Sequence, residues 1–247
     1  MEWIKTINSN HDFYKFNINN HHTEVEWAFQ TAYLKTKNTI DSWQQRSLCK
    51  RFTNIFLGDL AKNLLKSFIL FHKPNLMKFI TEYDITRNDN FLQPDEYDLR
   101  IAKGNTFYNI EIKSSGEKTY QNNDINSLFN NRRIIVNVNN THQHFEDFLI
   151  QIMFVPMDLK FFQNENFDCD DFELFCKKYL HSFYAQNMTA YIVGYADKTM
   201  QQKAADRLFN VKNKSAGAQQ RYYADLKICD SLPIQAFLKK LDEILIL

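Results

Sequence analysis

The chain has 247 residues, a formal net charge of +1, 44% hydrophobic residues and 24% charged residues. These values are ordinary for a soluble globular domain that is long enough to bury a sizeable core. They exclude a strongly basic surface over the whole protein. Because the charges of a basic groove and of an acidic metal site can cancel in the net charge, composition alone does not show whether the protein binds nucleic acid.

Four cysteines are scattered along the chain: Cys49, Cys169, Cys176 and Cys229. Without a C-x-x-C pair they do not predict a zinc cluster, and a disulfide framework is unusual at this length, so free thiols are expected. The N-terminus lacks an apolar signal core, and no stretch approaches the ~18 apolar residues of a membrane span. We therefore expect a bacterial cytoplasmic protein with no membrane partner.

The first third of the chain predicts helices. Apolar residues recur at helical spacing over 23–35 and again over 40–71, where they form a wide stripe. His72-Lys73-Pro74 ends the second helix, as basic residues followed by a proline should.

After residue 90 the pattern changes to short apolar runs typical of strands. Strands over 97–101 and 107–113 flank the turn residues 103–105 and predict a hairpin. Further strands are expected at 134–138, 148–155, 189–195 and 222–228, and helices at 170–186, 200–209 and 232–245. The order predicts one α/β domain over 1–247, with a helical region 1–74 packed on an α/β core 75–247.

The hairpin carries the residues of chemical interest. Because side chains alternate along a strand, Asp98 lies on the face opposite to Leu99, and Glu111 and Lys113 share a face opposite to Ile112. Pairing of the two strands can bring Asp98, Glu111 and Lys113 together.

Two carboxylates that meet in this way repel each other unless a cation lies between them. Oxygen ligands of this kind suit Mg²⁺, which polarises a phosphodiester and activates water. A neighbouring ammonium can orient that water and neutralise charge on the phosphate. The sequence thus predicts phosphodiester hydrolysis with Asp98, Glu111 and Lys113 as catalytic residues.

Two other acid-x-Lys triplets test the specificity of the pattern. Asp158-Leu159-Lys160 follows Pro156, which is expected to end a strand, so this triplet falls in a loop. Asp225-Leu226-Lys227 lies on a predicted strand without a hairpin partner that carries an acid. Only the copy at Glu111 combines an upstream acid, a turn and strand periodicity.

Pro94-Asp95, Asp98 and the run Glu111-Ile112-Lys113-Ser114-Ser115 resemble the PD-(D/E)xK nuclease superfamily, in particular its type II restriction endonucleases, over residues 83–115. The resemblance implies a restriction-endonuclease-like fold with a central mixed β-sheet flanked by helices, Mg²⁺-dependent cleavage of double-stranded DNA and a homodimer. It also implies that Asp98, Glu111 and the backbone carbonyl of Ile112 bind the metal, and that Lys113 is the catalytic lysine.

Two points stay open within this resemblance. The first acid can be Asp95, which follows Pro94, although Asp98 fits the alternating run and the spacing better. Many family members carry a glutamate on the preceding helix, where this chain has Lys62, so a second metal site is in question. Asp59 and Glu82 are the substitutes considered.

Basic residues outside the motif are candidates for DNA contact. They are Lys118, Arg132, Arg133, Lys203, Arg207, Lys212, Lys214 and Arg221. Tyr83, Asp84 and Arg87 precede the motif, where contact with DNA or the active site is one alternative, but we expect an ordinary surface ion pair. The pairs His21-His22 and His142/His144 predict solvated loop histidines, because a third metal ligand is lacking.

The sequence thus predicts a Mg²⁺-dependent endodeoxyribonuclease, in particular a sequence-specific type II restriction enzyme. Two alternatives are a repair or modification-dependent nuclease of the same fold, and an inactive DNA-binding protein of that fold.

Overall fold

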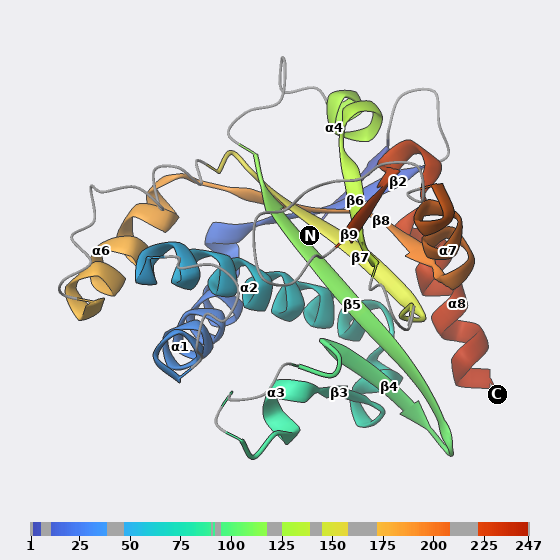
Figure 1. Cartoon of the computed structure of the whole chain (residues 1–247), viewed down its shortest axis with the longest axis horizontal. Helices are drawn as coiled ribbons and strands as arrows, with labels where there is room; N and C mark the ends of the chain where they lie inside the picture. The colour runs from blue at the N-terminus through green and yellow to red at the C-terminus, as the bar shows by residue number, and fades with distance from the viewer. Residues whose placement is uncertain are drawn as a thin grey trace.

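A mixed β-sheet of seven strands forms the middle layer of the protein (Figure 1). The computed structural model describes residues 2–5, 11–38, 47–89, 91, 95–117, 125–138, 145–157, 172–207 and 222–246. The strands are β1 (Glu2–Lys5), β2 (Asp12–Asn17), β3 (Ile80–Glu82), β4 (Leu99–Lys103), β5 (Thr106–Gly116), β7 (Phe148–Val155) and β8 (Thr189–Asp197). Their order is β1-β2-β8-β7-β5-β4-β3; β5 and β7 are parallel and all other neighbours antiparallel. The predicted α/β class with a central mixed sheet is confirmed.

Different elements cover the two faces of this sheet. One face packs on α1 (His22–Asn38), α2 (Leu48–His72), α6 (Phe172–Ala185) and α8 (Ile234–Ile246). The other packs on α4 (Ile125–Asn131), α7 (Lys198–Asp206) and a separate two-stranded sheet of β6 (Arg133–Val138) and β9 (Tyr222–Lys227). A short helix α3 (Tyr83–Thr86) follows β3, and 3₁₀ turns lie at Ile18–Asn20, Pro74–Lys78 and Ile228–Asp230.

Strand β7 is buried along its whole length because both of its faces are covered. Phe148 and Ile150 point into the core beneath α2 and α8, whereas Leu149 and Met153 point into the core beneath α7 and β6. These two cores identify the faces of the neighbouring strand β5, which carries the candidate site. We call them the α2 face and the α7 face.

The predicted helical region 1–74 is wrong at its start. Helices α1 and α2 are present, but β1 and β2 precede them and extend the central sheet. Phe13, Tyr14 and Phe16 are all buried in β2, in keeping with the preference of aromatic residues for strands. β2 pairs with β1 at one edge and with β8 at the other, where Tyr14 lies opposite Ile192, so its place in the sheet also depends on a contact from the far end of the chain.

The cysteine expectation also needs correction at one position. Cys176 and Cys229 are free, but Cys49 at the start of α2 is disulfide-bonded. Among the described helices, none combines the length and the apolarity of a membrane span.

A cluster of buried ion pairs joins α1 and α2 to the segment that leads into the hairpin. Lys35 Nζ lies 2.7 Å from Asp59 Oδ1 and 2.8 Å from Asp84 Oδ2, and Lys62 Nζ also pairs with Asp84. Glu82 is 3% exposed and pairs with Lys66. We call this set, together with Arg87, the buried ion cluster.

The predicted surface ion pair of Asp84 and Arg87 is therefore wrong. Their side chains are only 7% and 4% exposed, and both belong to the cluster. Burial raises the pKa of Asp84, but the charges of Lys35 and Lys62 outweigh burial and hold it below its usual value. Ionised Asp84 thus neutralises two buried ammonium groups.

Asp84→Asn should destabilise the fold by about 3 kcal/mol or more, because it leaves the buried charges of Lys35 and Lys62 undercompensated. The matched control is Asp242→Asn, which removes the partner of Lys73 where the acid is 50% exposed. That change should cost less than about 1 kcal/mol. Urea unfolding of both variants measures the difference, and equal costs would contradict the burial of the cluster's charges.

Candidate active site

Strands β4 and β5 form the hairpin that the sequence predicts. Leu99 pairs with Ile110 and Lys103 with Thr106. The turn contains Gly104 at φ 59°, in the left-handed region where a side chain would add strain. The predicted hairpin and turn are confirmed.

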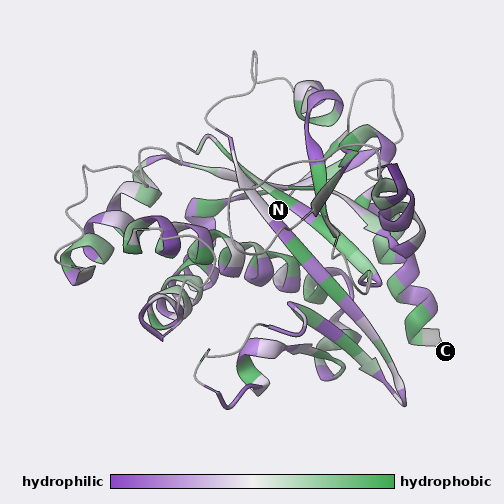
Figure 2. Ribbon diagram, in the orientation of Figure 1, coloured by the Kyte–Doolittle hydropathy of each residue, from purple (hydrophilic) through white to green (hydrophobic). Residues whose placement is uncertain are grey.

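The two faces of the hairpin differ in polarity, and β5 alternates along its length in Figure 2. Leu99 and Ile110 are fully buried and Ile112 is 8% exposed, all in the α2-face core. Glu111 and Lys113 alternate with them and lie on the α7 face, with side chains 28% and 23% exposed. The predicted separation of apolar and charged residues is confirmed.

Asp98 lies in a bend just before β4 rather than on a strand. Its Oδ2 accepts a 2.6 Å hydrogen bond from the backbone N–H of Ile112. Pairing of β4 with β5 stops at Ile110, so Asp98 contacts the edge of β5 that β4 leaves open. The N–H and C=O of a strand residue point to the same edge, which places the carbonyl of Ile112 on the Asp98 side as well.

The charges of these residues are coupled. Burial, and next the negative charge of Glu111, raise the pKa of Asp98 to about 7, against the opposing effects of the Ile112 N–H, Lys113 and Lys62. Lys113 Nζ forms an ion pair with Glu111 Oε1. The structure thus brings Asp98, Glu111 and Lys113 together, and the two acids repel each other.

Asp95, the alternative first acid, is engaged elsewhere. Its Oδ1 lies 2.5 Å from Arg87 Nη1, and its Oδ2 lies 3.9 Å from Lys35 Nζ. Glu111 acts on the pKa of Asp98. Between the two candidates, the geometry favours Asp98.

The helix position that carries Lys62 offers no second acid to the site. Lys62 is buried in α2 and pairs with Asp84, Asp59 and Glu82. Asp59 and Glu82, the proposed substitutes, are themselves bound to Lys35 and Lys66. Lys62 instead supplies a positive charge that lowers the pKa of Asp98.

The candidate DNA contacts fall into three groups: arginines in ion pairs, exposed residues at α7, and residues outside the described part of the chain. Arg132 Nη2 lies 2.7 Å from Glu117 Oε2, and Arg133 pairs with Asp225. Lys203 and Arg207 are exposed at α7, which covers the α7 face of the sheet. Four candidates lie outside the described residues: Lys118, Lys212, Lys214 and Arg221.

Other sequence features have simpler outcomes. Asp225 is on β9 and is paired with Arg133, so the second triplet forms no acidic pair there. His21 is buried, not solvated, and its ring nitrogen lies 3.4 Å from Glu24. The triplet 158–160 and His142/His144 lie outside the described residues.

Gln151 is a polar residue of the site that the sequence reasoning missed. It lies on β7 opposite Lys113, is 1% exposed and donates from Nε2 to Ser115 Oγ at 3.1 Å. Its Oε1 is buried and has no hydrogen-bond partner among the described residues. The available signal was a single amide inside an otherwise apolar strand, because buried polar groups need a partner.

The donor set fits a hard divalent cation. It consists of two carboxylates and the backbone oxygen of Ile112, and a cation between the acids would relieve the repulsion that raises the pKa of Asp98. Within the described ranges, no group of three or more His, Cys, Asp or Glu side chains is placed for a metal. Mg²⁺ tolerates so small a set because it keeps several waters.

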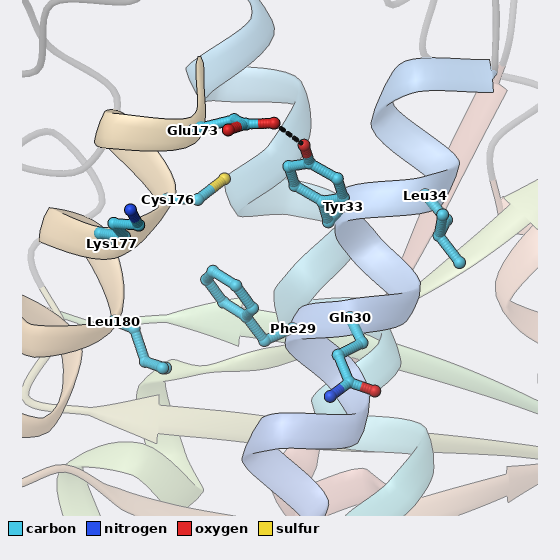
Figure 3. Close-up of a pocket in the computed structure, with 8 residues that line it drawn as sticks. All are labelled: Phe29, Gln30, Tyr33, Leu34, Glu173, Cys176, Lys177 and Leu180. Atoms are coloured by element: carbon cyan, nitrogen blue, oxygen red, sulfur yellow. Dashed lines mark hydrogen bonds between the residues drawn. The ribbon is translucent and has the colours of Figure 1, made fainter. Parts of the chain in front are cut away.

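An apolar groove of about 700 Å³ lies between α1 and α6, on the α2-face side of the sheet (Figure 3). Phe29 and Tyr33 of α1 face Cys176 and Leu180 of α6. Burial raises the pKa of Cys176 to about 12, so this thiol is not a thiolate nucleophile at neutral pH. The groove lacks the chemistry that the hairpin has.

Comparison of the chain with protein-family models, curated proteins and solved structures gives no match.

Asp98→Asn should stabilise the metal-free protein at pH 8 by about 2–4 kcal/mol, because the buried acid then carries no charge beside Glu111. The pKa of Asp98 is higher in the folded state than the ordinary value of 3.8 that it has in the unfolded chain, so wild type loses stability as pH rises from about 4 to 7. The gain should therefore shrink at pH 5. Thermal melts in EDTA measure it.

Asp225→Asn is the matched control, since it neutralises an acid that is 53% exposed on β9. It should give no stabilisation at either pH. An Asp98→Asn protein that melts at or below wild type at pH 8 would contradict the coupling.

Proposed function

We propose that the protein is a Mg²⁺-dependent endodeoxyribonuclease that cleaves double-stranded DNA. The observation that carries the proposal is the convergence of Asp98, Glu111 and Lys113 at the open edge of β5. Two coupled carboxylates with an adjacent ammonium on one hairpin are the groups that metal-assisted phosphodiester hydrolysis requires. The central mixed sheet flanked by helices agrees with the superfamily that the motif resembles.

Each residue has a separate role in this proposal. Asp98, Glu111 and the carbonyl of Ile112 would hold Mg²⁺, which when bound polarises the phosphodiester and stabilises charge on the leaving oxygen. Lys113 now pairs with Glu111. When Glu111 binds a cation, the Lys113 ammonium is available to orient the attacking water and to neutralise charge on the phosphate.

Within this class we propose a sequence-specific type II restriction enzyme of the bacterial cytoplasm. Such an enzyme acts as a homodimer, because a two-fold axis presents one site to each strand of a palindromic sequence. Lys203 and Arg207, which are exposed at α7, and Arg132, which pairs with Glu117, are the described basic residues that we assign to contact with the DNA backbone.

Lys113→Ala should reduce cleavage of plasmid DNA in Mg²⁺ at least about 100-fold, because it removes the ammonium that acts on the scissile phosphate. The chain provides a matched control, Lys227→Ala, in the acid-x-Lys triplet on β9 that lacks a second acid. That variant should cleave as wild type does, and EDTA should abolish both activities. Agarose gels measure the rates.

The pattern of products separates the alternatives. Discrete bands identify a sequence-specific enzyme, and a smear or a requirement for modified DNA identifies a repair or modification-dependent nuclease. Uncut DNA shifted in a gel with Mg²⁺ identifies an inactive DNA-binding protein. Lys113→Ala cleaving as fast as wild type would refute the assignment of the site.

A further inference from the structure

Arg100 lies on the same polar strip of the hairpin as the two acids. It is two residues beyond Asp98, about 7 Å along an extended chain. It pairs across the hairpin with Asn109, which is two residues before Glu111. The side chains of Arg100 and Asn109 therefore share the strand face that carries Glu111, and Arg100 is part of the surface that surrounds the site.

Neutral groups hold the guanidinium of Arg100 in place. Its Nε donates a 2.8 Å hydrogen bond to Asn109 Oδ1. Its Cζ lies 3.8 Å from the ring centroid of Tyr97 and 5.4 Å from that of Phe107. Tyr97 is 7% exposed and contacts Tyr83 edge-on, so the ring beneath the guanidinium is itself fixed.

The charge of Arg100 is not neutralised by a carboxylate within the described part of the chain. Nearby cations differ in this respect: Arg87 pairs with Asp95, Lys62 with Asp84 and Lys113 with Glu111. The one hydrogen bond that the Arg100 side chain makes in the described part of the chain uses Nε and a neutral amide, so both terminal nitrogens remain available as donors.

A fixed, stacked guanidinium with free terminal donors is suited to a phosphate. Its planar fork matches two oxygens of a phosphate, and stacking reduces the entropy lost on binding. A lysine in the same place would lack both properties. Phe107, which is 58% exposed, lies close enough to the guanidinium to add a second aromatic contact.

We propose that Arg100 binds a backbone phosphate of the DNA strand that the site cuts, next to the scissile phosphate. This inference rests on the proposed function and adds a substrate-binding residue to it. Asp98 and Glu111 repel a polyanion, and Arg100 offsets that repulsion from a position two residues farther along the hairpin. Tyr97 and Asn109 are positioning residues for its guanidinium.

The test is equilibrium binding of a fluorescent duplex by anisotropy, in EDTA, as a function of salt. Arg100→Gln removes the charge but keeps a side chain that can reach Asn109. It should weaken binding about tenfold and reduce the slope of log K against log salt by about 0.9, the value of one lost phosphate contact. Arg100→Lys should restore the slope but only part of the affinity.

Lys240→Ala is the matched control, since it removes an exposed cation from α8, which packs on the α2 face. Its affinity and salt slope should equal those of wild type. Melting temperatures verify that each variant is folded. If Arg100→Gln does not fold, Arg100→Lys is compared with Asn109→Leu. Asn109→Leu removes the hydrogen-bond acceptor of Arg100 Nε and should also weaken DNA binding.

A folded Arg100→Gln protein with the wild-type salt slope would overturn the inference. Failure of the wild-type protein to bind the duplex would also overturn it. Cleavage by wild type separates this failure from failure of the proposed function. If wild type cuts DNA and the slope is unchanged, only the role of Arg100 is wrong. If wild type cuts no DNA under any condition tested, the proposed function is wrong and takes the inference with it.

Discussion

The repulsion between Asp98 and Glu111 is the constraint around which this part of the protein is organised. The register of the hairpin, with Leu99 opposite Ile110, places the two acids next to each other at the point where β4 begins. Burial and the charge of Glu111 then raise the pKa of Asp98 to about 7. A fold gains no stability from such a pair, and arrangements that cost stability in this way are typical of functional sites.

The register of the hairpin also determines that one of its faces is apolar and the other is charged. A slip of one residue would turn Glu111 and Lys113 into the α2-face core and expose Ile110 and Ile112. The α2-face core, which takes up Ile110 and Ile112, opposes that slip because the slip would bury two charged side chains in their place. The apolar residues of β5 therefore determine where its charged residues point.

The buried ion cluster supports the other half of the site. It ties the segment between β3 and β4 to α2 through Asp84 and to α1 through Lys35. Asp98 is the last residue of this segment, and Asp95, three residues before it, pairs with Arg87 of the cluster, so the cluster limits where the Asp98 carboxylate can lie. Lys62 also extends a positive charge toward Asp98, at the position where the resemblance led us to consider an acid. Buried ion pairs contribute little net stability, so a positional role accounts for the cluster better than a stabilising one.

The sequence by itself determined the local elements of this protein. Apolar stripes identified α1 and α2, and strand alternation with the turn at Gly104 identified the hairpin and the three polar residues on or next to it, because these signals depend on neighbours along the chain. The tertiary structure decided what depends on distant contacts. It made β2 a strand through β8, separated β6 and β9 into their own sheet, and buried Asp84 and Arg87. It also gave Asp98 its contact with Ile112 and Arg100 its aromatic neighbours. The spacing of residues along the sequence does not show which side chains from different segments meet in the same buried site.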